Sequence, residues 1–135
     1  MSENFHDDEE LYVELRLWHD ELIPEELTVL FGYAPSRAAK CGGHIPGRAM
    51  PVDTGLWAYK DAVEFPWDVN AAIDKLLGKF ENNVPFLDYC KNNGINIEIA
   101  VVMYLKKNTP IMVLSPSVLG RLASIGATLD FGMYI

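Results

Sequence analysis

Residues 11–18 read LYVELRLW, and this stretch decides the class of the fold. Alternate residues divide into an aliphatic set on one face of an extended chain and a polar and aromatic set on the other: Leu11, Val13, Leu15 and Leu17, against Tyr12, Glu14, Arg16 and Trp18. A period of two residues is typical of a β-strand that buries one face. We therefore predict a strand whose aliphatic face covers a core.

A short helix is predicted directly after this strand, over residues 20–32. Pro24 suits the first helical position, because the N–H group that proline lacks would be unbonded there in any case. Gly32 suits the helix stop, where the chain commonly takes a left-handed conformation. We expect the apolar side of this helix to lie on the sheet.

Further periodic segments follow, separated by glycine, proline and asparagine. Apolar residues at three- and four-residue steps indicate the clearest helix, between Asp68 and Phe80. The apolar run from Ile95 to Leu105 indicates a strand in the middle of the sheet. The remaining predicted elements are a strand at 54–59, a helix at 85–92, a short strand at 111–114, a helix beginning at 115 and a closing strand through 129–134.

These elements predict an α+β fold in the order β-α-β-α-α-β-β-α-β. We expect a single domain over 11–135, with a mixed or antiparallel sheet of about five strands and helices packed mainly on one face. Residues 1–10, MSENFHDDEE, are predicted to be an acidic, flexible N-terminus.

Charge and composition disfavour several functional classes. The 135 residues carry a formal net charge of −8, which argues against binding to nucleic acid, because phosphate backbones require a basic face. No apolar run reaches the roughly 20 residues of a membrane span, and the N-terminus lacks the pattern of a signal peptide. The two cysteines are expected to be reduced thiols, so we predict a cytoplasmic location and no membrane association.

Cys41 and His44 are the one pair of residues that suggests a metal or a nucleophile. A structural zinc site needs four ligands, and no second pair of this kind is present. A catalytic thiol needs an orienting group and an oxyanion-binding pocket, and the sequence shows neither. We therefore predict no metal, no cofactor and no catalytic residue.

An acidic cluster lies where the first strand meets its helix: Asp20, Glu21, Glu25 and Glu26. The positive end of the helix dipole stabilises one or two carboxylates. Four carboxylates exceed that requirement, so the cluster is either a solvated helix start or a contact patch for a basic partner. We take these four residues as the candidate partner-binding set.

Four aromatic residues in the first two strands form a second candidate set: Tyr12, Trp18, Trp57 and Tyr59. We expect them to share the face of the sheet opposite the aliphatic one. There they either line a ligand-binding groove or interface or form a small core under residues 33–53, a long segment without periodicity.

Three segments, at these separations, resemble one known family: LWHDELIPEELTVLFG (17–32), TGLW (54–57) and LSPSVLGRLASIGATLDFGMY (114–134). That family is the bacterial domain of unknown function 4279. The resemblance implies a small bacterial α+β protein and brings no catalytic residues with it. Members of such families often lie near secreted toxins as candidate immunity proteins.

Three functional hypotheses remain open from the sequence. The first is a non-enzymatic protein that binds a basic protein partner, such as a toxin that an immunity protein neutralises. The second is a small-ligand or regulatory domain that uses the aromatic face and the 33–53 loop. The third is a small enzyme of unrecognised type. The strand order and the oligomeric state are not determined by the sequence.

Overall fold

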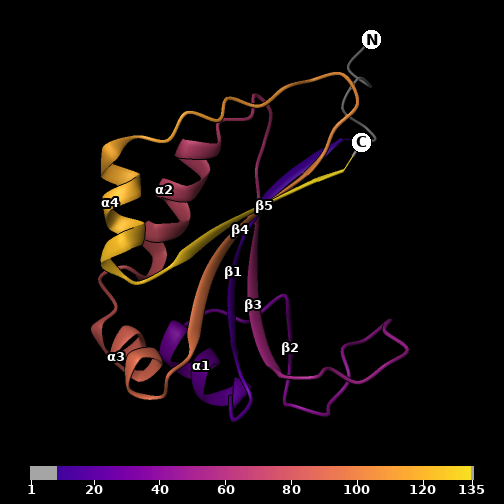
Figure 1. The fold of residues 1–135 in the computed structure, drawn as a ribbon, viewed down its shortest axis with the longest axis vertical. Coiled ribbons are helices and arrows are strands. Elements are labelled where there is room, and N and C mark those ends of the chain that lie inside the picture. Colours follow the sequence, from indigo (N-terminus) through magenta and orange to yellow (C-terminus); the bar gives the residue numbers. More distant parts are fainter. Residues whose placement is uncertain (1–8, 135) are drawn as a thin grey trace.

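The computed structural model describes residues 9–134, which form five strands and four helices (Figure 1). In chain order these elements are β1 (Glu10–His19), α1 (Pro24–Phe31), β2 (Arg37–Ala39), β3 (Gly55–Ala62), α2 (Val69–Phe80), α3 (Val84–Asn92), β4 (Asn96–Tyr104), α4 (Pro116–Ser124) and β5 (Thr128–Tyr134). Within this range no helix has the length and apolarity that crossing a membrane requires.

The five strands form one mixed sheet in the order β2-β3-β1-β4-β5. Neighbouring strands are antiparallel except for β4 and β5, which are parallel. The strand predicted from LYVELRLW therefore lies at the centre, between β3 and β4. The predicted α+β fold with a five-stranded mixed sheet is confirmed.

The four helices cover one face of this sheet, and the core lies between the two layers (Figure 1). Leu15 of β1 lies between Tyr59 of β3 and Ile99 of β4, and both Leu15 and Ile99 are fully buried. The helices contribute Leu76 and Leu122, which are 0% and 4% exposed. Burial of these apolar side chains is the main stabilising contribution to the fold.

The predicted strand at 111–114 is wrong. Ile111 makes one isolated bridge, beside the start of α2: its N–H donates to the carbonyl of Trp67, and its carbonyl accepts from Val69, both at 2.9 Å. The position next to β4 is occupied by β5, so this segment crosses to α4 without joining the sheet. The fifth strand is instead β2, inside the segment for which we predicted no regular structure.

The described fold begins two residues earlier than predicted. Residues 1–8 of the predicted N-terminal segment lie outside the described range. Glu10 is the first residue of β1, and Glu9 is 8% exposed and bound to the loop after β4. These last two positions therefore belong to the domain.

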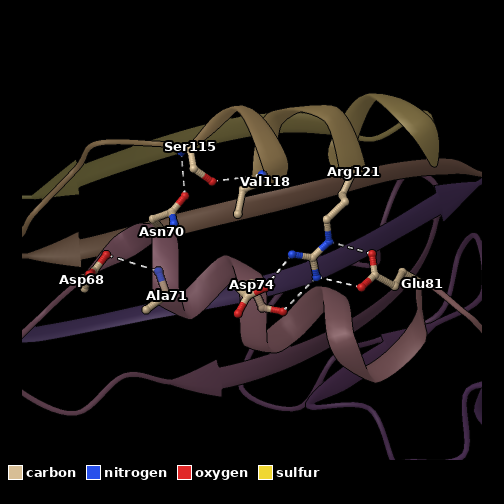
Figure 2. A network of polar contacts seen from close by, with 8 residues as sticks. All are labelled: Asp68, Asn70, Ala71, Asp74, Glu81, Ser115, Val118 and Arg121. Carbon is tan, nitrogen blue, oxygen red and sulfur yellow. Dashed lines mark hydrogen bonds and ion pairs between the residues drawn. The ribbon is translucent and has the colours of Figure 1, made fainter.

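A polar network joins α2 to α4 on the outer side of the helical layer (Figure 2). The guanidinium of Arg121 in α4 donates to both carboxylate oxygens of Glu81 and also to Asp74 in α2. At the other end of the pair, the N–H of Ser115 donates to Oδ1 of Asn70 at 2.9 Å. The two helices are thus held at both ends.

Candidate functional site

The predicted acidic cluster lies at one end of the molecule, and all four of its carboxylates are exposed. Asp20 and Glu21 lie in the turn after β1, and Glu25 and Glu26 lie in the first turn of α1. Helix α1 has no side-chain N-cap and no basic residue in its last turn. Two of the four carboxylates, those of Glu25 and Glu26, therefore lie in the first turn, where the helix dipole favours them.

Two of these carboxylates have partners within the fold. Oδ1 of Asp20 accepts a hydrogen bond from the hydroxyl of Thr54 at 2.7 Å, which ties the turn after β1 to the start of β3. Oε1 of Glu26 accepts from the hydroxyl of Tyr89 in α3 at 2.6 Å. Since both bonds use one oxygen of each carboxylate, the acidic surface keeps acceptor capacity for a partner.

A shallow apolar hollow lies beside Glu25 and Glu26, between α1 and α3. Its volume is about 390 Å³, and the same two glutamates line it together with Val29, Leu30 and Tyr89. Val29 is 80% exposed, although it lies on a helix of a folded domain. The structure thus combines an apolar floor with an acidic rim. The sequence did not predict this arrangement, because the residues come from two helices.

The two helices that form this hollow are held by specific contacts. The side-chain amide of Asn83, the N-cap of α3, donates to the carbonyl of Leu30 at 2.8 Å. The hydrogen bond to Glu26, followed by partial burial, raises the pKa of Tyr89 to about 12. At neutral pH Tyr89 is therefore protonated, and its hydroxyl donates to Glu26 at the rim.

The four candidate aromatic residues do not share a face, so that prediction is wrong. The register of β1 and β3 pairs Trp57 with Leu17 and Tyr59 with Leu15, which places both on the helix-covered face. Phe31 of α1 lies 5.0 Å from the ring of Trp57 and 5.1 Å from that of Tyr59.

Tyr12 and Trp18 remain on the uncovered face of the sheet. They lie six residues apart along β1, so they are not neighbours. The expected groove of four aromatic residues does not form. A separate small core of these four residues under residues 33–53 does not form either. Trp57 and Tyr59 pack under α1 in the main core, where the ring of Tyr59 also contacts Tyr33 of that segment, with centroids 5.9 Å apart.

The uncovered face carries a row of charged side chains that was not predicted from the sequence. Glu14 is only 3% exposed, and its Oε1 accepts from Nε of Arg16 at 2.6 Å and from Nη2 of Arg37 at 3.0 Å. Arg16 also reaches Glu98 of β4 at 3.4 Å. Ala58 lies between the two arginines in register, and its small side chain leaves room for Arg37.

In this charged row, two arginines are paired with two glutamates within the fold. The charged row could have been predicted from the sequence, because Glu14 and Arg16 carry opposite charges at alternate positions of one strand. On the same face, the small side chains of Ala58 and Ala100 are 0% and 1% exposed, although no helix lies over them.

The 33–53 segment is organised by its own backbone. The N–H of Gly42 donates to the carbonyl of Val52 at 3.0 Å, and the N–H of Val52 donates to the carbonyl of Gly43 at 2.9 Å. Cys41 and His44 lie in this segment and are exposed, and Sγ of Cys41 donates to the carbonyl of Asp53. In the described part of the chain, no group of three or more His, Cys, Asp or Glu side chains forms a potential metal site.

A second hollow, of about 610 Å³, lies where α3 and α4 approach the starts of β4 and β5. Trp18 lines it together with Asp88, Lys91 and Asn96. Of the four predicted aromatic residues, Trp18 is the one that borders this hollow.

Comparison with known proteins identifies one family. A family model described as "Domain of unknown function (DUF4279)" matches residues 9–135, nearly the whole chain. No curated protein sequence and no solved structure matches significantly.

Proposed function

This chain belongs to the DUF4279 family, and we propose that it is a non-enzymatic domain that binds a basic protein partner through its acidic α1 surface. The name of the family assigns no activity, so the proposal depends on the surface itself. The α1 surface comprises Asp20, Glu21, Glu25, Glu26 and the apolar hollow beside them.

One observation carries the proposal: the exposed apolar floor of the hollow is bordered by two glutamates. A solvated helix start explains the acidic residues but does not explain Val29, which exposes 80% of its surface next to them. An apolar side chain of a partner fits the hollow, while lysine or arginine residues beside it meet Glu25 and Glu26. Interfaces commonly combine an apolar centre with a charged rim in this way.

The setting that we propose is the bacterial cytosol, with the partner a cationic toxin and this chain its immunity protein. The net charge of −8 supports a cationic partner, because complementary charge accelerates association. The family resemblance supports the bacterial origin.

The experiment compares wild-type protein with Glu25→Lys, using each as bait in a pull-down from the native organism followed by mass spectrometry. We expect at least one basic protein to be retained by the wild type and lost with the variant. The association rate of that protein should fall as ionic strength rises. Salt screens the attraction between exposed charges, and at about 0.15 M salt this attraction extends only roughly 8 Å.

Glu64→Lys is the matched control, since Glu64 is also an exposed glutamate but lies outside the α1 surface. It changes net charge by the same amount and should retain the partner. Val29→Ala should weaken binding without changing the salt dependence. Equal retention by wild type and Glu25→Lys would remove the α1 surface from the interface.

A second candidate function is small-ligand binding in the hollow of about 610 Å³ that Trp18 lines. Its volume is within the range of small-molecule sites. Tryptophan fluorescence during a metabolite screen tests this candidate, with Trp18→Phe as the control that should lose the ligand-dependent change. No ligand-dependent change in the wild-type protein would reject it.

A further inference from the structure

The two edges of the sheet are protected very differently. At one edge, β2 has three residues and carries Arg37. At the other edge, β5 has seven residues, TLDFGMY, with one charged side chain, Asp130, and no proline. Natural proteins usually blunt edge strands with short length, charges or proline, because the free N–H and C=O groups of an edge pair readily with another strand.

β5, which forms the outer edge of the sheet beside β4 (Figure 1), exposes apolar side chains in its second half. None of its seven residues is buried, and Phe131, Met133 and Tyr134 are 41%, 53% and 54% exposed. In residues 9–134, no strand pairs with the outer side of β5. An apolar edge strand without protection indicates a surface that is covered in the working protein.

We propose that β5 pairs with β5 of a second copy of this chain, antiparallel, about a two-fold axis at Gly132. The product is a homodimer in which one continuous sheet runs through both copies. This inference goes beyond the proposed function and does not depend on it, since β5 and α1 are separate surfaces.

The sequence of β5 is complementary to itself in this register. Phe131 lies opposite Met133 of the second copy, and the symmetry repeats that contact, which joins an aromatic ring to a thioether. Asp130 lies opposite Tyr134 of the second copy, so the two carboxylates do not face each other across the axis, which would be destabilising. A closed two-fold interface requires such a self-complementary patch.

The surroundings of Tyr134 and Gly132 fit this arrangement. The ring of Tyr134 stacks on Tyr104 with centroids 4.8 Å apart, which fixes its orientation on the uncovered face. A Cβ atom added to Gly132 would meet only the Tyr134 ring, at ordinary contact distances of 3.5–4.0 Å. A cysteine side chain therefore fits at position 132.

The effect of salt distinguishes this dimer from binding to a basic partner. Two copies that each carry −8 repel one another, and salt screens that repulsion. Dimerisation should therefore strengthen with ionic strength, whereas binding to the α1 surface should weaken. Failure of one proposal is thus distinguishable from failure of the other.

The first test is sedimentation equilibrium of the full chain. Wild-type protein should show a mass rising toward twice that of one chain as concentration increases, more strongly in 0.5 M than in 0.05 M sodium chloride. Met133→Lys should remain monomeric. Met50→Lys is the matched control, because Met50 is also exposed, at 73%, but lies outside β5. A monomeric wild type, or a Met133→Lys variant that still dimerises, would overturn the proposal.

The second test fixes the register by disulfide formation in a Cys41→Ser background, since Cys41 is an exposed thiol. Directly opposite residues of an antiparallel pair have Cα atoms about 4.5–5.5 Å apart, within the Cα separation of roughly 4.4–6.8 Å that a disulfide bridges. Gly132→Cys should therefore give a covalent dimer on mild oxidation. Asp130→Cys should not, because its two copies are offset by four residues, roughly 13 Å. Crosslinking of both variants, or of neither, would overturn the proposed axis.

Discussion

Arg121 of α4 and Glu81 at the end of α2 form a bidentate pair: Nε donates to Oε2 at 2.8 Å, and Nη2 donates to Oε1 at 2.7 Å. The same guanidinium donates to Asp74, so one side chain contacts two carboxylates of the neighbouring helix (Figure 2). A planar guanidinium fits this geometry, whereas an ammonium group does not. The pair fixes how α4 lies against α2.

Replacing Arg121 with methionine should lower the urea midpoint of unfolding, because both carboxylates lose their partner. Arg121→Lys should recover only part of the loss, since lysine cannot donate to Glu81 in a fork. Arg48→Met, at an exposed arginine in the 33–53 segment, is the control and should have little effect. Equal midpoints for Arg121→Met and Arg48→Met would show that the network does not stabilise the fold.

Two leucines of α4 offer a matched test of the core. Leu122 is 4% exposed and Leu119 is 48% exposed, on the same helix. Leu122→Ala should lower the free energy of unfolding by about 2–5 kcal/mol, because it leaves a cavity. Leu119→Ala should cost less than about 1 kcal/mol. Urea denaturation monitored by circular dichroism measures both, and similar losses would mean that α4 packs by another face.

The sequence predicted β1, α1 and the side of each that faces the core, because the patterns of these two segments are unambiguous. In LYVELRLW every second residue is aliphatic and the others are polar or large, so only one face can be buried. Pro24 and Gly32 likewise delimit α1, and Gly32 has a φ of 92°, in the left-handed region. These features depend on residues that are near in sequence.

The face of β3 could not be predicted in the same way. Leu56, Trp57, Ala58 and Tyr59 are all apolar or aromatic, so their alternation does not show which set is buried. The register with β1 decides, by placing Trp57 against Leu17. Its indole N–H then donates to the hydroxyl of Thr28 in α1, at 3.0 Å. That partner is far away in sequence, and so the choice of face is a tertiary property.

The hollow beside the acidic cluster escaped prediction for the same reason. The four carboxylates were visible in a short segment, but Tyr89 comes from α3, and it meets Glu26 only because the two helices pack together. The sequence thus indicated the charge of this surface and not its shape.

The two cysteines should differ sharply in reactivity. Cys90 is buried in α3, and burial raises the pKa of its thiol to about 12. The thiolate is the reactive form, so iodoacetamide at pH 8 should label only Cys41, which is exposed, in the native protein. Both should react in 6 M guanidinium chloride. Rapid native labelling of Cys90, read by peptide mass spectrometry, would show that α3 opens or packs differently.

Glu9 holds the loop that follows β4. Its Oε2 accepts the backbone N–H groups of three consecutive residues, Lys106, Lys107 and Asn108, at 2.6, 2.8 and 3.1 Å. Its Oε1 accepts from the side-chain amide of Asn108 at 2.7 Å. The hydrogen bond from Lys106, opposed by desolvation and reinforced by the bonds from Asn108 and Lys107, lowers the pKa of Glu9 from 4.5 to about 2.

Glu9→Gln should therefore destabilise the protein in a pH-dependent way. The folded pKa is lower than the unfolded one, so the charged form contributes stability that is fully present above pH 4.5 and lost as pH falls toward 2. The wild type should exceed the variant in free energy of unfolding at pH 7, and the difference should shrink between pH 4.5 and 2.5. Glu64→Gln, at an exposed glutamate, should show no such change. Urea titrations across this range measure the difference, and a gap that stays constant with pH would mean that Glu9 acts without its charge.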